Sequence, residues 1–295
     1  MKKLIAWMLC VVTVLTLFIP CAMAAGVSAG DARVVIGANL TDAQKDQVYS
    51  YFGVTRGSVT ELSVNIDEER SRLGGLISAD KIGSYSLSCI FIRVRKEGEG
   101  IDIQTNNINW CSADMYKNAL LTAGITDAEV RITAPYPVSG TAALTGVYKA
   151  YEDITGTTIS EDAKSASTQE LVVTGNLAEM IGSEDATALI NELKLLLDET
   201  KNMSDDEVRE QIVSIAGDMG YTLTDDEVTQ ILELVRKLEK LDVSQLQDTI
   251  KNALNAAGTV NKVTESISTF GQKVQAFFGK VGRFFSNLFG GSKTE

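Results

Sequence analysis

One turn in the sequence combines residue types that can hold an anion. Pro135-Tyr136-Pro137 ends a predicted strand, and Ser139, Gly140 and Thr141 open a predicted helix. Free backbone N–H groups and the helix dipole can bind a carboxylate or phosphate at such a point. The other interpretation is a tight strand-to-helix turn, with Ser139 or Thr141 as the N-cap and Gly140 allowing close packing. The sequence favours this second interpretation, because N-caps are common.

Three consecutive acids, Asp67, Glu68 and Glu69, follow the end of a predicted strand. They could supply half of the carboxylate pair that hydrolyses sugars, which needs a second carboxylate at a defined distance. They are also typical first-turn acids, which a helix dipole stabilises. A sequence cannot place the second carboxylate, so the first-turn interpretation is favoured.

The absence of histidine restricts the chemistry open to this chain. With no His, a Ser-His-Asp triad, a Cys-His dyad and every His-based zinc site are excluded. Cys89 and Cys111 are the two cysteines outside the predicted signal at residues 1–24, so a four-cysteine metal site is excluded as well. We therefore predict no metal and no cofactor, and an enzyme is the less favoured class.

The two cysteines lie near the open ends of a predicted hairpin, formed by residues 86–95 and 101–109 around Glu97-Gly98-Glu99-Gly100. Outside the cytoplasm Cys89 and Cys111 could form a disulfide. The hairpin places Cys89 opposite about Ile108, so Cys111 would have to curl back to reach it. Two buried free thiols are the alternative, and the sequence leaves both open.

The carboxyl end carries a basic amphipathic segment rich in phenylalanine. At about 100° per residue, one arc without charged residues collects the apolar side chains Phe270, Val274, Phe277, Phe278, Val281, Phe284, Phe285, Leu288 and Phe289. Lys273, Lys280 and Arg283 lie opposite this arc or at its flank. An aromatic apolar face with a basic polar face is typical of a helix that lies in a membrane interface.

The partner of this segment can be a membrane surface or a protein. Amphipathic helices are mostly core elements in globular proteins, so the stripe could instead dock on the folded body or on a second copy of the chain. The whole chain has a formal charge of −12, and its basic end makes the rest more acidic still. An acidic body repels phosphate backbones, so we predict no nucleic-acid binding.

The elements that must position these residues divide into two units. Residues 25–156 alternate strand and helix patterns, which predicts an α+β or α/β domain of about five strands. Thr41 to Gln44 is a capping box that opens a helix to about Phe52, and Ser112 caps a helix that ends at Gly124. A strand over 129–134 is predicted to end at Pro135.

Residues 157–258 show helical periodicity, which predicts an all-α domain, and 259–295 form the amphipathic tail. The polar stretch from Thr157 to Gln169 indicates a linker or a helix edge. Residues 204–208 and 224–228 are near-identical helix starts, each with a hydroxyl three residues before a Glu. Helix capping explains them better than a calcium loop, because the central Gly and closing Glu of an EF-hand are missing.

Residues 33–171 resemble the YpuA-like exported proteins of Gram-positive bacteria, a domain of unknown function. The helical region to about Leu254 is similar to the second half of that family, whereas the Phe-rich tail is less typical. The resemblance implies export and supplies no catalytic residues. Its motifs are the stretches 35–41 (VIGANLT), 51–54 (YFGV), 73–75 (LGG), 107–110 (NINW), 118–125 (NALLTAGI) and 134–146 (APYPVSGTAALTG).

The first 24 residues have the order of a secretory signal. Lys2 and Lys3 precede an uncharged apolar run from Leu4 to Ile19, and Ala22-Met23-Ala24 offers small residues at a cleavage site. The run is short for a spanning helix, so a retained anchor is the less favoured alternative. We therefore expect an exported protein that is extracellular or attached to the outer face of the cell membrane.

Together these features favour a non-catalytic binding or interaction protein of the cell envelope, with the Phe-rich helix contacting a membrane or a partner. The competing classes are an extracellular carboxylate-dependent hydrolase of envelope polymer and a small-anion sensor that uses the turn at Ser139. Self-association through the tail is a variant of the first class.

Overall fold

The computed structural model of the chain describes residues 29–256. The predicted signal (1–24) and the predicted amphipathic tail (259–295) lie outside these residues. Within residues 29–256, no helix has the length and apolar character needed to cross a membrane.

A five-stranded mixed sheet forms the N-terminal unit, in the order β2-β1-β3-β5-β4. Four of its strands run parallel and β3 runs antiparallel to both of its neighbours. The carboxyl ends of the four parallel strands therefore meet at one edge of the sheet. The strands are β1 (Ala32–Gly37), β2 (Thr60–Val64), β3 (Cys89–Val94), β4 (Ile101–Ile108) and β5 (Ala128–Val138).

The predicted hairpin between residues 86–95 and 101–109 is wrong, because β5 lies between these two strands. β3 is buried along nearly all of its length, whereas alternate residues of β4 are exposed. A strand buried on both faces belongs inside a sheet, and an alternating strand suits an edge. β4 therefore takes the edge and pairs with β5 in parallel.

The strand β5 also runs further than predicted, passing Pro135 and Pro137 to end at Val138. Here the ladder with β4 is interrupted by a register shift around Asn107, a non-glycine residue with a positive φ of 55°. Proline lacks the N–H that a regular ladder needs, so it is tolerated where pairing is irregular. Asn107 Nδ2 donates to Ala134 O at 2.9 Å and holds the two strands together at this point.

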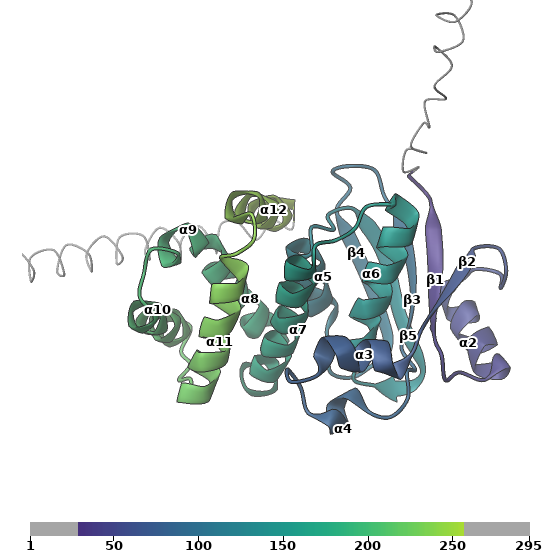
Figure 1. Cartoon of the computed structure of the whole chain (residues 1–295), viewed down its shortest axis with the longest axis horizontal. Coiled ribbons are helices and arrows are strands. Elements are labelled where there is room, and N and C mark those ends of the chain that lie inside the picture. Colours follow the sequence, from purple (N-terminus) through teal and green to yellow (C-terminus); the bar gives the residue numbers. More distant parts are fainter. Residues whose placement is uncertain (1–28, 257–295) are drawn as a thin grey trace, which may run out of the picture.

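Helices cover the two faces of the sheet unequally. α2 (Asp42–Phe52) packs Val48, Tyr49 and Phe52 against β1 and β3 in a small cluster on one face. The predicted capping box at Thr41 is confirmed. The other face is covered by α5 (Ala113–Thr122) and α6 (Thr141–Thr155), with α3 (Ile66–Leu73) and α4 (Ala79–Ile82) near the edge where the parallel strands end (Figure 1).

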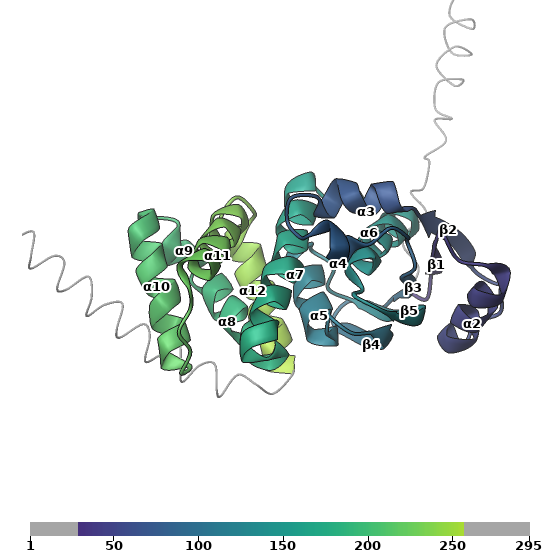
Figure 2. The same ribbon diagram turned by 90° about the horizontal axis from the view of Figure 1, so that it is seen from below.

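The second half of the chain is helical, as predicted, and extends to one side of the sheet (Figures 1 and 2). Ser204 and Thr224 form the two predicted capping boxes, so capping accounts for the repeated helix starts. The helices are α7 (Glu161–Ile181), α8 (Ser183–Leu195), α9 (Leu197–Thr200), α10 (Asp205–Asp218), α11 (Asp225–Leu238) and α12 (Val243–Ala256).

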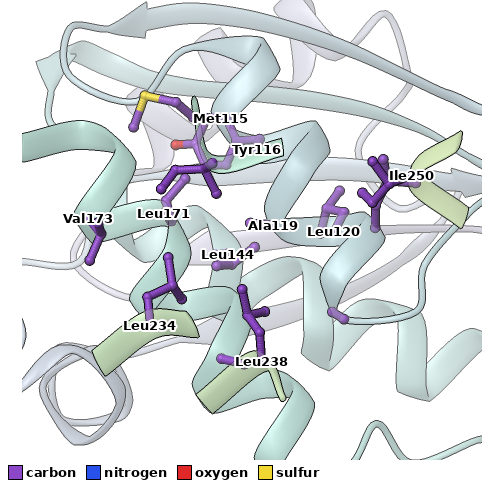
Figure 3. Close-up of a cluster of buried hydrophobic side chains, with 14 of the residues drawn as sticks. Met115, Tyr116, Ala119, Leu120, Leu144, Leu171, Val173, Leu234, Leu238 and Ile250 are labelled. Atoms are coloured by element: carbon purple, nitrogen blue, oxygen red, sulfur yellow. The ribbon is translucent and has the colours of Figure 1, made fainter. Parts of the chain in front are cut away.

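Of the two interpretations of the polar stretch after Thr157, the linker is wrong and the helix edge is confirmed, because α7 begins at Glu161 with Ser160 as its N-cap. Lys164, Thr168 and Glu170 are buried, since α7 packs between α5 and the remaining helices. One hydrophobic cluster runs from the sheet through α5 and α7 to α11 and α12, as Figure 3 shows for Leu120, Leu171 and Leu234. The two units therefore share a continuous core.

Trp110 follows the end of β4, and its ring packs against Gly175 of α7. An ideal Cβ at Gly175 would be 2.4 Å from Trp110 Cζ2. The indole Nε1 donates to Glu179 Oε1 at 2.6 Å, and Lys81 Nζ lies 4.6 Å from the ring centroid. There is thus no room for a side chain beneath the ring.

We expect Gly175→Ala to lower the free energy of unfolding by about 1–3 kcal/mol, because the indole must move. Gly217→Ala is the matched control, since its Cβ would meet no atom within 4 Å on helix α10. That variant should gain roughly 0.5–1 kcal/mol from helix propensity. Urea unfolding measures both, and equal changes in the two variants would contradict the packing argument.

Candidate functional site

The predicted anion turn is closed by packing. Ser139 Oγ donates to Lys81 O at 3.1 Å, and Tyr116 OH donates to Gly140 O at 2.6 Å. Thr141 is 2% exposed, and a Cβ at Gly140 would lie 2.3 Å from Tyr116 OH. The close-packing interpretation of Gly140 is therefore correct. The N-cap is Gly140 itself, with φ of 92°, rather than Ser139 or Thr141.

The two cysteines are free, buried thiols, so the disulfide alternative is wrong for this structure. Cys89 lies in the cluster beneath α2, and Cys111 lies in the large cluster on the other side of the sheet. Burial raises the pKa of each thiol to about 12. Neither is therefore the thiolate that a nucleophile or metal ligand requires.

A polar groove lies between α3, α6 and α7. Its volume is about 670 Å³, and its lining is dominated by charged and hydroxyl side chains. α3 supplies one wall, the outer face of α6 supplies the floor, and the first two turns of α7 supply the other wall. The lining residues are Asn65, Asp67, Glu68, Ser71, Arg72, Thr145, Tyr148, Lys149, Glu152, Glu161, Ser165 and Thr168.

Ion pairs join the three helices across this groove. Lys149 Nζ lies 2.7 Å from Glu68 Oε1 and also donates to Ser63 O at 2.7 Å. Arg72 NH1 lies 3.3 Å from Glu161 Oε2, so α3 is linked to α7. Behind the wall, the buried Lys164 contacts Glu152 at 2.7 Å and Glu161 at 3.1 Å. The charged lining is therefore held in position by its own pairs.

These contacts keep two of the groove carboxylates ionised. Burial alone would raise the pKa of Glu68, but hydrogen bonds from Lys149 and the Asn65 N–H outweigh it and hold the pKa below its ordinary value. A hydrogen bond from Lys164, assisted by Arg72, lowers the pKa of Glu161. The floor is also fixed, since Tyr148 OH lies 2.5 Å from Ser167 Oγ and Arg72 lies 5.8 Å from the centroid of the Tyr148 ring.

The three acids singled out in the sequence separate in the structure. Asp67 and Glu68 line the groove, whereas Glu69 is 1% exposed and does not line it. The first-turn interpretation is confirmed, because all three lie in the first turn of α3 and Asn65 forms a capping box with Glu68.

The α6 and α7 residues of the groove were not predicted from the sequence. A signal was present in α6, where Thr145, Lys149 and Glu152 fall on one stripe of an otherwise apolar helix. A polar stripe on a helix that is buried elsewhere indicates a face that meets water or a ligand. The α7 residues lay in the stretch interpreted as a linker or a helix edge, so no face of a full helix was assigned to them.

A second cavity of about 540 Å³ lies where the end of α5, the α6–α7 connection and the α11–α12 turn meet. Apolar residues such as Leu121, Ile159 and Leu246 form much of its lining. It brings together fewer charged groups than the groove does, so the groove is the stronger candidate. Within residues 29–256, no cluster of acids and cysteines is arranged to hold a metal ion.

The remaining predicted site residues, from Phe270 to Phe289 with Lys273, Lys280 and Arg283, lie outside the described residues.

Comparison with known proteins identifies the family. Residues 36–257 match the family described as "Protein of unknown function (DUF1002)". The chain is 37% identical over 299 residues to "Uncharacterized protein YpuA" of Bacillus subtilis (strain 168), spanning 98% of this chain and 100% of that protein. No solved structure matches the chain. The resemblance inferred from the sequence motifs is thereby confirmed, and the chain belongs to the DUF1002 family of proteins of unknown function.

Proposed function

We propose that this protein is a non-catalytic binding protein of the cell envelope, which holds a polar ligand in the groove between α3, α6 and α7. The observation that carries the proposal is the charged and hydroxyl lining of a cavity of about 670 Å³, fixed by ion pairs between three helices. Prepositioned polar groups of this kind orient a ligand without having to reorganise.

The titration of the groove favours binding over hydrolysis. A glycoside hydrolase needs a carboxylic acid whose pKa is raised so that it can protonate the leaving oxygen. The pKa values of Glu68 and Glu161 are lowered instead, and both carboxylates are tied to cations. Glu69 has a raised pKa, but it does not line the groove.

The proposed protein is secreted and attached to the outer surface of the cell membrane. The Lys2-Lys3 start, the apolar run and the Ala22-Met23-Ala24 site support secretion. The Phe-rich stripe and its three basic residues support contact with an anionic membrane surface. The acidic body would then project away from the lipid headgroups, which repel it.

Liposome co-sedimentation tests the attachment. We expect the mature protein to pellet with anionic vesicles, and a variant lacking residues 260–295 to remain in the supernatant, because burying several Phe contributes about 1.5–3 kcal/mol each. A full-length variant with Phe277, Phe278, Phe284 and Phe285 replaced by Ser keeps the basic charge and should also fail to pellet. Equal pelleting of all three proteins would remove the membrane contact from the proposal.

Thermal unfolding tests the groove against a panel of neutral sugars, amino sugars and short peptides. A ligand at about 100 times its dissociation constant should add about 2.7 kcal/mol to the unfolding free energy. Ser71→Trp places a large ring in the groove wall at an exposed position, and we expect it to abolish the shift. Ser214→Trp, exposed on α10, is the matched control and should respond as the wild type does. If Ser71→Trp keeps the response, the groove is not the site.

A further inference from the structure

The groove carries an excess of negative charge. Four of its lining side chains are carboxylates, and three cations meet them: Arg72 and Lys149 in the lining and Lys164 behind it. Each cation is already paired, Lys149 with Glu68, Arg72 with Glu161 and Lys164 with Glu152, so one carboxylate is in excess. An anionic ligand would therefore have to displace an existing carboxylate, whereas a cationic ligand meets uncompensated charge.

Asp67 is the carboxylate of the lining that has no partner within residues 29–256. Glu68, Glu152 and Glu161 are each paired with a cation, but no ion pair or side-chain hydrogen bond of the Asp67 carboxylate occurs in this part of the chain. Asp67 is exposed at the first turn of α3. A carboxylate in this situation can accept charge-assisted hydrogen bonds from a ligand cation at little cost.

Thr145, on α6, has a hydroxyl that also lies unpaired in the groove among the described residues. Its side chain lines the groove and the residue is 8% exposed, yet within residues 29–256 its hydroxyl makes no hydrogen bond. A threonine hydroxyl inside a helix commonly bonds the carbonyl one turn back, and the Thr145 hydroxyl makes no such bond within α6. The Thr145 hydroxyl is therefore available at the floor of the groove to a ligand hydroxyl or amine.

Arg72 supplies an internal precedent for a cation in this groove. Its guanidinium lies over the Tyr148 ring, 5.8 Å from the centroid, and contacts Glu161. The combination of an aromatic face and a carboxylate is favourable for an organic cation. The groove thus already holds one cationic group of the chain itself, the Arg72 guanidinium, between α3, α6 and α7.

We infer that the ligand of the groove is a hydroxyl-rich molecule that carries a protonated amine, of the amino-sugar oligomer class. The amine pairs with Asp67 and a hydroxyl bonds to Thr145. This inference rests on the proposed function, because it names the ligand class of the same groove.

Isothermal titration of the mature protein with a glucosamine tetramer, at about pH 6 where such an amine is protonated, tests the inference. The N-acetylated tetramer has the same ring structure without the charge. We expect the amine form to bind at least tenfold more tightly than the acetylated form, and Asp67→Asn to remove most of that difference, because a hydrogen bond to a charged group is lost. Asp225→Asn is the control, since Asp225 is an exposed first-turn acid of α11, away from the groove.

The outcomes separate the two proposals. Equal binding of both tetramers, lost in Ser71→Trp, would overturn the amine inference and leave the groove as a binding site. Tight binding of the amine form that Asp67→Asn and Asp225→Asn weaken equally would also overturn it, because general charge would then explain the effect. Binding of neither tetramer would overturn the amine inference and leave the groove to the wider ligand panel. Binding that survives Ser71→Trp would overturn both. Selective binding that only Asp67→Asn and Ser71→Trp remove supports both.

Discussion

Lys194→Met should lower the free energy of unfolding by about 3–5 kcal/mol, because it leaves a buried carboxylate without its counter-charge. Lys194 and Glu170 are both fully buried, and Lys194 Nζ lies 2.5 Å from Glu170 Oε1. Thr122 Oγ1 donates to Glu170 at 2.6 Å, and Lys194 Nζ donates to Asn118 O at 3.3 Å. The pair therefore joins α5, α7 and α8 where the two units meet.

Replacing both members of the pair should restore most of the loss. In Glu170→Leu/Lys194→Met no buried charge remains, and apolar replacement of a buried pair is often neutral or stabilising. Thr122 lies four residues after Asn118 on α5, so its hydroxyl can turn back to the carbonyl that Lys194 leaves. We expect the double variant to lie within about 1 kcal/mol of the wild type.

Urea unfolding of the wild type, the two single variants and the double variant measures the coupling as a double-mutant cycle. Burial raises the pKa of Glu170 and lowers that of Lys194. Without Lys194 the carboxyl should bind a proton more readily still, so the cost of Lys194→Met should shrink as the pH falls. Additive single effects with no recovery in the double variant would sink the pairing argument.

Glu69→Gln should stabilise the protein at pH 8 and leave it almost unchanged at pH 4. Glu69 is 1% exposed, and its Oε1 makes no hydrogen bond within the described residues. Burial raises the pKa of Glu69 from 4.5 to about 7, and the neighbouring Ser86 hydroxyl and Arg70 offset only part of that rise. The folded protein therefore holds a proton on Glu69 at pH values where the unfolded chain has lost it.

The sign follows from proton binding in the two states. Between pH 4.5 and about 7 the folded state binds more protons at Glu69, so this residue makes the unfolding free energy fall as the pH rises. The full penalty is present above about pH 7 and amounts to about 3 kcal/mol. The difference between Glu69→Gln and the wild type should thus grow from near zero at pH 4 to about that value at pH 8.

Glu68→Gln is the neighbouring control with the opposite sign. Its folded pKa is lowered, so Glu68 contributes stability above pH 4.5 that is lost as the pH falls. Removing it should flatten the acid side of the stability profile and leave the slope between pH 5 and 7 in place. Urea unfolding curves from pH 4 to 8 measure these profiles. A Glu69→Gln profile parallel to that of the wild type would contradict the raised pKa of the buried Glu69 carboxyl.

Local features of the sequence were interpreted correctly where a few neighbouring residues determine the structure. The capping boxes at Thr41, Ser204 and Thr224 each depend on a hydroxyl and a side chain three residues later, and all three form. The switch from mixed strand and helix patterns to helical periodicity after Gly156 is confirmed as well. Both signals are contained within one or two turns of chain.

The errors concern partners that are distant in the sequence. β3 and β4 are adjacent along the chain, but burial on both faces places β3 between β1 and β5. The stretch from Thr157 to Gln169 is polar, yet Lys164 and Glu170 are buried because Glu152 and Lys194 meet them from other helices. Composition alone could not distinguish such a paired, buried helix face from a solvated one.

By itself the sequence determined the family, the order of a mixed strand-and-helix half followed by a helical half, and the exclusion of histidine chemistry, because these depend on residue types, motifs and local periodicity. Only the tertiary structure decided that Asp67 and Glu68 share a groove with Thr145, Lys149 and Glu161, and that Ser139 to Thr141 are packed shut. These outcomes depend on which helix and sheet faces pack together. The packing is determined by the burial of apolar surface across the whole chain, which no short segment shows.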